Sequence, residues 1–149
     1  GRLTDDSDRF WLDAENDVYL TEEDISQLAQ AKAANVAGLH LLHQNYGIDF
    51  SDLDVFYLAG GFARHIDIDH ARRIGLIPDL PDERIVQVGN AALEGATLAL
   101  LSVSAREETD QLVRRIEHVE LETFPEFFHC FTDGAQFVPF QNRITEAII

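Results

Sequence analysis

The 149-residue sequence predicts an α/β domain in which helices flank a mixed sheet. Two short apolar runs, 54–59 and 85–88, are rich in β-favouring residues, and glycine follows each of them, as expected for buried strands. Apolar residues at three- and four-residue steps over 21–46 and small residues over 91–101 indicate two long helices. A chain of this length is expected to form one domain, residues 1–149.

The composition argues against several classes of function. Hydrophobic residues make up 46% of the chain and charged residues 26%, as in an ordinary globular protein. The formal net charge of −16 repels phosphate backbones and anionic lipids, so we expect no binding to nucleic acid or to membrane surfaces. No window of the sequence approaches the roughly 18 apolar residues that a membrane span requires.

Cys130 is the only cysteine. A single cysteine excludes an intramolecular disulfide and a cysteine-ligated iron–sulfur cluster within these residues. It also fits a protein of the reducing cytoplasm, where we expect this one to function. The chain begins at Gly1 without an initiator methionine, so we expect it to be a piece of a longer protein.

The N-terminal region is predicted to form a hairpin followed by a helix. The short β-like runs 10–13 and 18–20 are separated by Asn and Asp residues that suit a turn. Thr21 and Asp24 form a capping-box pattern, with acidic residues placed against the positive end of a helix dipole. Gly47 is expected to end this helix.

The buried face of this helix is predicted from residues at three- and four-residue steps. They are Ile25, Leu28, Lys32, Asn35, Leu39, Leu42 and Tyr46. Lys32 and Asn35 interrupt the apolar character of the face. An unpaired buried charge costs several kcal/mol, so Lys32 either finds a partner or extends its side chain to water at the edge of the core.

The strand predicted at 54–59 leads directly into Gly60 and Gly61. Glycines adopt positive φ, and without Cβ atoms they let a flat or anionic ligand lie against the main chain. The carboxyl ends of strands in open α/β sheets are where nucleotides usually bind. The alternative is that the two glycines only make a tight turn.

His65, Asp67 and Asp69 alternate after this turn, and imidazole with carboxylates can bind divalent metals. We predict no metal site here. Asp69 is better suited to be the N-cap of a short helix that ends at Gly75.

The second strand ends at Gly89, and Asn90 is a good N-cap for the helix 91–101. Small residues in this helix permit the close approach of another backbone. A charged outer helix is predicted over 106–116, and the alternation of polar and apolar residues over 119–122 predicts an exposed strand.

Six of the ten phenylalanines lie near the C-terminus: Phe124, Phe127, Phe128, Phe131, Phe137 and Phe140. One interpretation is that they pack in the core of a terminal helix and strand. The other is an exposed docking surface for further domains or for a second copy of the chain in a homodimer.

Five motifs in order resemble one family. They are Thr21–Ile25, Ala31–Asn35, Val55–Phe62, Arg73–Pro81 and Val88–Ala92. Together they resemble the C-terminal part of the ATP-dependent reductive activators of corrinoid proteins, over about residues 10–139. Those activators are ferredoxin-fused members of the superfamily of acetate and sugar kinases, heat-shock chaperone ATPases and actin. The resemblance implies an incomplete actin-like (ribonuclease H-like) ATPase lobe.

The resemblance implies a nucleotide-binding role for seven residues and a catalytic role for none. They are Lys32, Gly60, Gly61, Phe62, Arg64, Gly89 and Asn90. In the chaperone ATPases an Arg three positions after the second glycine packs along the adenine, and Arg64 stands at that offset. A Lys on the corresponding helix of those ATPases contacts the adenosine, as we predict for Lys32.

The resemblance also implies the function of the complete protein. ATP with Mg²⁺ would drive electron transfer from an N-terminal 2Fe-2S ferredoxin domain to an inactive Co(II) corrinoid protein or corrinoid methyltransferase. The sequence holds neither an Asp-x-Gly-Thr strand turn nor a Walker loop for the phosphates, so we expect these 149 residues alone to be inactive. The alternatives are a small-molecule kinase of the same superfamily and a non-catalytic protein-interaction module.

Overall fold

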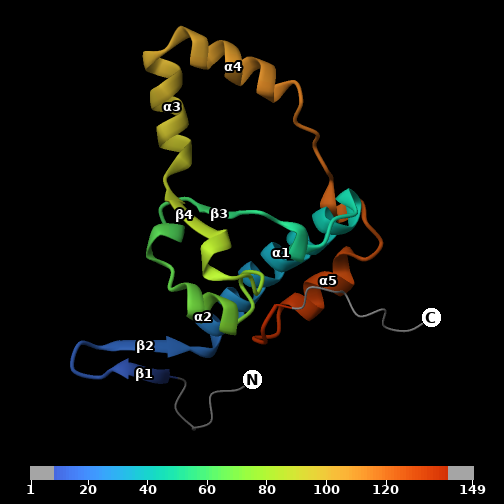
Figure 1. Cartoon of the computed structure of the whole chain (residues 1–149). Helices are drawn as coiled ribbons and strands as arrows, with labels where there is room; N and C mark the ends of the chain where they lie inside the picture. The colour runs from blue at the N-terminus through green and yellow to red at the C-terminus, as the bar shows by residue number, and fades with distance from the viewer. Residues whose placement is uncertain (1–8, 141–149) are drawn as a thin grey trace.

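The structure is a computed structural model and describes residues 9–140 (Figure 1). The chain contains both helices and strands, including a β3–α2–β4 unit, so the predicted α/β class is confirmed. The elements are β1 (Arg9–Asp13), β2 (Val18–Thr21), α1 (Glu22–Tyr46), β3 (Phe56–Ala59), α2 (Ile68–Arg73), β4 (Ile85–Gly89), α3 (Ala91–Leu101), α4 (Val103–Val113) and α5 (Phe127–Gly134). Short 3-10 turns lie at Phe50–Asp52, Ala63–His65, Asp82–Arg84 and Leu121–Thr123.

The prediction of a single mixed sheet is wrong for the described residues. β1 and β2 form one antiparallel pair, and β3 and β4 form a separate parallel pair. The hairpin projects away from the rest of the molecule in Figure 1, and α1 leads the chain from it toward the other pair. The β3–β4 pair lies apart from the hairpin, so the four strands form two separate sheets.

Local sequence signals place the ends of the first elements correctly. The amide of Asp24 donates to Thr21 Oγ1 at 3.1 Å, and the amide of Thr21 donates to Asp24 Oδ2 at 2.8 Å, which confirms the capping box. Gly47 ends α1 in the left-handed conformation, with φ at 65°. In the hairpin turn, Asp13 Oδ1 accepts from the amides of Glu15 and Asn16 at 3.0 and 3.2 Å.

The predicted buried face of α1 is rotated relative to the observed one. The buried residues are Lys32, Ala33, Val36, Ala37, Gly38, His40 and Leu41, whereas Leu28, Leu42 and Tyr46 are exposed. α5 packs against α1 and decides this face. A Cβ atom added at Gly134 would lie 3.1 Å from Val36 Cβ and 3.2 Å from Ala33 Cα, so small residues let the two helices approach closely.

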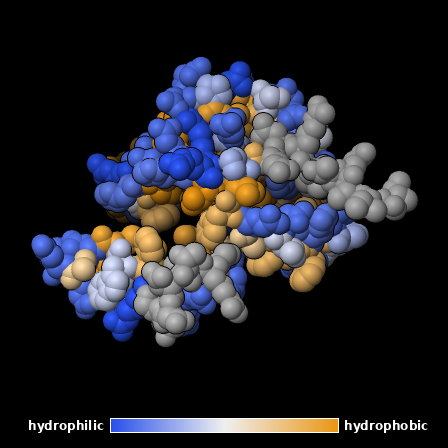
Figure 2. Space-filling model, turned by 90° about the horizontal axis from the view of Figure 1, so that it is seen from below, coloured by the Kyte–Doolittle hydropathy of each residue, from blue (hydrophilic) through white to orange (hydrophobic). Residues whose placement is uncertain are grey.

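Two hydrophobic clusters form the core around α1. Val36, Phe50 and Phe140 make one, and Ala37, Leu41 and Cys130 make the other, with Leu121, Phe124, Phe127 and Phe131 packed against it. Core packing is therefore confirmed for four of the C-terminal phenylalanines. Phe128 is the clear exception, at 78% exposed. Seen from below, hydrophobic residues lie in a band across the middle of the molecule, between hydrophilic margins (Figure 2).

Two further predictions of local structure are wrong. Asp67, and not Asp69, is the N-cap of α2, because Asp67 Oδ1 accepts from the amide of His70 at 2.8 Å. Asp69 instead pairs with Arg72 at 3.1 Å. No strand forms at 119–122, and a 3-10 turn begins at Leu121, since Leu121 packs into the core beside α1 and no neighbouring strand is available to it among the described residues.

α3 and α4 form an arm that stands away from the rest of the molecule (Figure 1). Asn90 caps α3 as predicted, because its Oδ1 atom accepts from the amide of Leu93 at 3.1 Å. α4 starts at Val103, earlier than predicted, because Ser102 caps it through the amide of Ala105 at 3.2 Å. Neither helix has a buried residue, and Leu98 and Leu101 of α3 are 61% and 79% exposed.

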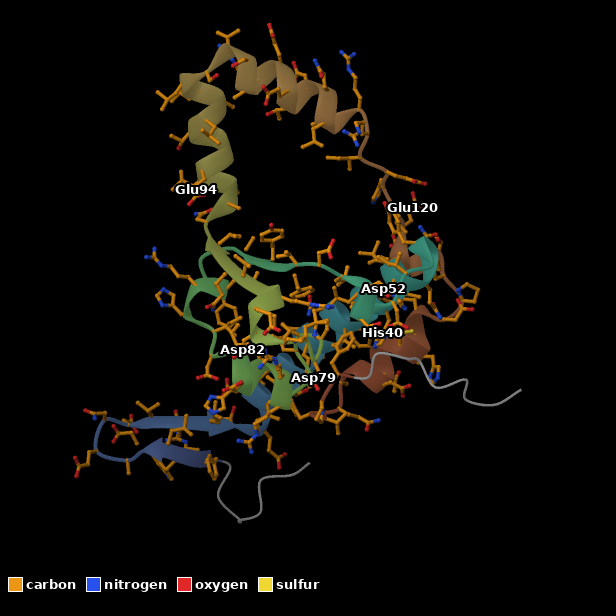
Figure 3. The ribbon with its side chains drawn as sticks, in the orientation of Figure 1. His40, Asp52, Asp79, Asp82, Glu94 and Glu120 are labelled. Carbon is orange, nitrogen blue, oxygen red and sulfur yellow. The ribbon has the colours of Figure 1, made fainter. Side chains whose placement is uncertain are left out.

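The charged residues are spread over the surface. The labelled carboxylates in Figure 3 lie on different parts of the fold, from Glu94 on α3 to Asp79 and Asp82 below β4. Across residues 9–140, no three or more His, Cys, Asp and Glu side chains are grouped so as to hold a metal ion. In the same part of the chain, none of the helices is both long and apolar enough to cross a membrane.

Candidate functional site

The two glycine turns lie side by side at one edge of the parallel pair. β3 and β4 run in the same direction, with Phe56 opposite Ile85 and Tyr57 opposite Val86, so their carboxyl ends meet. The amide of Gly60 donates to the carbonyl oxygen of Gly89 at 2.6 Å. The fold thus brings together two turns that are almost thirty residues apart in the sequence.

The backbone at these turns is open. Gly60 has a φ of 107° and Gly89 a φ of 64°, conformations that residues with a Cβ atom rarely adopt. A Cβ atom added at Gly60, Gly61 or Gly89 would meet no other atom within 4 Å. A flat ligand can therefore approach the main chain at this edge without displacing a side chain.

The segment after the first turn carries the next two predicted site residues. Phe62, directly before the 3-10 turn, is 76% exposed. Arg64, in the middle of the turn, is also exposed. The buried Ala63 and a hydrogen bond from the amide of His65 to the carbonyl of Phe62, at 3.0 Å, shape this turn. An aromatic ring and a guanidinium group therefore stand exposed beside the open glycines.

Asn90 follows Gly89 directly. Its side-chain oxygen is used to cap α3, through the bond to the amide of Leu93. Asn90, an exposed residue, thereby holds the second turn to the start of α3.

Lys32, the only lysine of the chain, lies in a different environment. It is 2% exposed, and its Nζ atom donates to the carbonyl oxygens of Gly134 and Gln136, at 2.7 Å each. Burial lowers the pKa of this amino group. Lys32 therefore has hydrogen-bond partners and does not extend its side chain to water at the edge of the core. Its two bonds connect α1 to the end of α5. Its contact with adenosine stays a prediction.

We expect the substitution Lys32→Met to destabilise the chain by about 3 kcal/mol, because it leaves the buried carbonyl oxygen of Gly134 and the part-buried carbonyl oxygen of Gln136 without their donor. Urea denaturation of the two proteins measures the difference. Arg73→Met, which removes an exposed cation from α2, is the control and should change the free energy of unfolding by less than about 0.5 kcal/mol. An equal effect of the two substitutions would contradict the structural role of Lys32.

Gln87 is a residue of this edge that the sequence analysis missed. Its Nε2 atom donates to the carbonyl oxygens of Ala63 and Ile66, at 2.7 and 2.9 Å. The only signal in the sequence is a polar residue inside the apolar strand 85–88.

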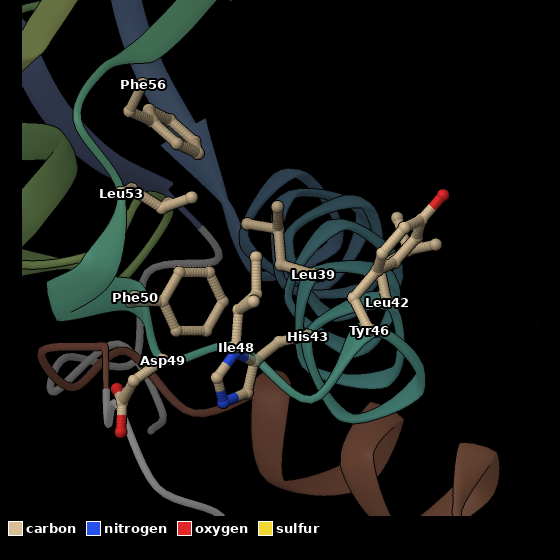
Figure 4. A pocket seen from close by; sticks show the side chains of 9 residues that line it. All are labelled: Leu39, Leu42, His43, Tyr46, Ile48, Asp49, Phe50, Leu53 and Phe56. Atoms are coloured by element: carbon tan, nitrogen blue, oxygen red, sulfur yellow. The ribbon is translucent and has the colours of Figure 1, made fainter.

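A separate hollow of about 160 Å³ lies between the C-terminal half of α1 and the segment that leads into β3 (Figure 4). Its lining is mostly apolar: Leu39, Leu42, His43, Tyr46, Ile48, Asp49, Phe50, Leu53 and Phe56. Sites for small molecules usually enclose about 300 Å³ or more and present several convergent polar groups. We therefore assign no ligand to this hollow.

Comparisons with known proteins all indicate the same family of proteins. The sequence model of a family described as the C-terminal domain of RACo, the ASKHA domain, matches residues 4–147. The corrinoid activation enzyme RamQ of Eubacterium limosum is 36% identical over 121 residues, which cover 81% of this chain and 20% of RamQ. The [Co(II) methylated amine-specific corrinoid protein] reductase of Methanosarcina barkeri is 30% identical over 118 residues, which cover 76% of this chain and 22% of the reductase.

A solved structure also matches. The reductive activator for corrinoid,iron-sulfur protein superimposes with a TM-score of 0.78 and 31% sequence identity, over 87% of this chain and 21% of that protein. The chain thus spans about a fifth of the length of each of these relatives.

Proposed function

Since this chain belongs to the family of C-terminal ASKHA domains of RACo-type reductive activators of corrinoid proteins, we propose that its two glycine turns form the adenosine-side wall of an ATP site in the full-length protein. One observation carries the proposal. Gly60 and Gly89 are hydrogen-bonded to each other at 2.6 Å, and the space over both glycines and over Gly61 is open.

The chemistry of the surrounding residues suits a purine nucleoside. The main chain at Gly60, Gly61 and Gly89 offers a flat surface for the ligand. Phe62 and Arg64 can stack on the base, and the guanidinium can also donate hydrogen bonds to it. Asn90 completes the second turn. Lys32 donates to two carbonyls, one in α5 and one in the segment after it, and its predicted contact with the adenosine would use the third hydrogen of its amino group.

In the full-length protein, ATP with Mg²⁺ would drive electron transfer from a 2Fe-2S ferredoxin domain to a Co(II) corrinoid protein or corrinoid methyltransferase, in the cytoplasm. This chain would supply the nucleoside wall and no redox chemistry. Cys130 is 4% exposed, and burial raises the pKa of its thiol, so it is a core residue and not a cluster ligand.

The exposed arm supports a position inside a larger ATPase core. α3 is mostly apolar, with Glu94 and Thr97 as its polar side chains, and a helix of that kind is normally buried. Parallel strands are likewise normally covered on both faces, yet Tyr57 of β3 is 64% exposed. We propose that the remaining part of an actin-like ATPase core covers α3 and this face of the sheet. A second copy of the chain in a homodimer is the alternative.

Isothermal titration calorimetry of the full-length protein with ATP and Mg²⁺ tests the function. We expect one ATP per chain to bind, and we expect ATP to be required for reduction of a Co(II) corrinoid protein, followed by its absorption spectrum. A pure interaction module would give no heat with ATP. A small-molecule kinase would bind ATP but would transfer phosphate without reducing cobalt.

A further inference from the structure

Gln87 lies in the middle of β4, opposite Leu58 of β3, and its side chain extends to the loop that follows the first glycine turn. Its Nε2 atom donates to the carbonyl oxygens of Ala63 and Ile66, at 2.7 and 2.9 Å. A carboxamide nitrogen carries two hydrogens, so both donors of the group are used. One side chain thus binds the loop to the strand at two points.

The two carbonyls lie at the beginning of the 3-10 turn and just after its end. Phe62 precedes Ala63 directly, and Arg64 follows it. Both of these side chains are exposed, so the position of the loop backbone decides where the ring and the guanidinium group lie. Besides Gln87, the bond between Gly60 and Gly89 holds this loop to the end of β4.

The strand pairing is irregular at the same place. Leu58 pairs with Gln87, but the next residue, Ala59, pairs with Gly89, so Val88 is an extra residue on β4. A bulge of this kind changes the direction of side chains at the end of a strand. Here it allows both the Gln87 side chain and the Gly89 carbonyl to bind the same loop.

We propose that Gln87 is a positioning residue for the adenosine moiety, acting through the loop that carries Phe62 and Arg64. This inference rests on the proposed ATP site and adds to it a residue that need not touch the ligand. Without the two hydrogen bonds, the loop is held mainly at Gly60, and the aromatic and cationic side chains lose their fixed position beside the glycines.

Two substitutions in the full-length protein test the role. Gln87→Met keeps the length of the side chain and removes both donors, and Gln87→Glu keeps its shape but places acceptors against two carbonyls. We expect each to raise the Kd of ATP by about tenfold or more, because two hydrogen bonds no longer order the binding surface. Calorimetry with ATP and Mg²⁺ measures the change.

Inorganic triphosphate with Mg²⁺ distinguishes positioning from general damage, because it lacks the nucleoside. Its affinity, measured by competition, should be the same in wild type and in both variants, while hydrogen exchange of residues 62–66 should become faster. The matched control is Asn35→Leu. It removes another carboxamide bond to a loop carbonyl, from Asn35 Nδ2 to Leu76 at 2.8 Å, and should leave ATP affinity within about twofold.

ATP binding as tight as that of wild type in both Gln87 variants would overturn the inference. So would an equal loss of ATP and triphosphate binding, since that pattern indicates a collapsed site. A wild-type protein that binds no ATP is a different result: it refutes the proposed function itself, and the positioning role with it.

Discussion

The substitution Gly61→Val in the full-length protein is expected to weaken ATP binding by about 100-fold or more. Gly61 lies between the positive-φ residue Gly60 and the exposed Phe62, and a Cβ atom at its position meets no other atom within 4 Å. The isopropyl group of valine would fill the space in which we place the nucleoside. Calorimetry with ATP and Mg²⁺ measures the loss.

The fold should tolerate this substitution, which makes the result interpretable. Gly61 itself does not have a positive φ, so a side chain there introduces no backbone strain. We expect the melting temperature to stay within about 2 °C of the wild-type value. Gly61→Ala should have a smaller effect on ATP affinity, and Ser51→Val, at an exposed residue in a different segment, should have none. An unchanged Kd of ATP for Gly61→Val would show that the nucleoside does not bind at this edge.

The substitution Gly75→Ala should destabilise the chain by about 3 kcal/mol or more. Gly75 has a φ of 71°, and a Cβ atom there would lie 2.0 Å from the carbonyl oxygen of Val138 and 3.1 Å from the amide nitrogen of Phe140. These are backbone atoms, so the clash can be relieved only if the segment 138–140 moves. That movement would withdraw Phe140 from its contacts with Phe50 and His40 in the core.

Gly47→Ala is the matched control for this prediction. Gly47 has nearly the same backbone conformation, with a φ of 65°, but a Cβ atom there meets nothing within 4 Å. Only the left-handed conformation is penalised, at about 1 kcal/mol. Urea denaturation of both variants measures the difference. Equal destabilisation would show that the C-terminal segment is not packed against Gly75 as described.

Short-range signals in the sequence predicted the local structure correctly. The capping box at Thr21, the end of α1 at Gly47 and the Asn90 cap of α3 all depend on residues within one turn of each other. The hairpin likewise follows from alternation and a polar turn. The family was also predicted correctly, because five motifs in a fixed order are far more specific than any one of them.

Each wrong prediction has a physical cause. The buried face of α1 was assigned from its leucines and its tyrosine, but α5 packs on the side where Ala33 and Ala37 allow close approach. Asp67 and Asp69 are both good N-caps, and the salt bridge of Asp69 with Arg72 leaves the cap to Asp67. Leu121 packs into the core instead of pairing in a strand. For α1 and Leu121, packing against segments distant in sequence decided between locally equivalent options, whereas the choice between Asp67 and Asp69 was decided within one turn of α2.

The amino-acid sequence by itself determined the family, the α/β class and the presence of two glycine turns after two strands, since these depend on local order along the chain. Only the tertiary structure decided that the turns meet through Gly60 and Gly89, that Gln87 binds the loop between them, and that Lys32 ends at α5. The physical reason is that hydrogen bonds between distant segments depend on how the helices and strands pack. A local pattern of residues is not sufficient to specify that packing.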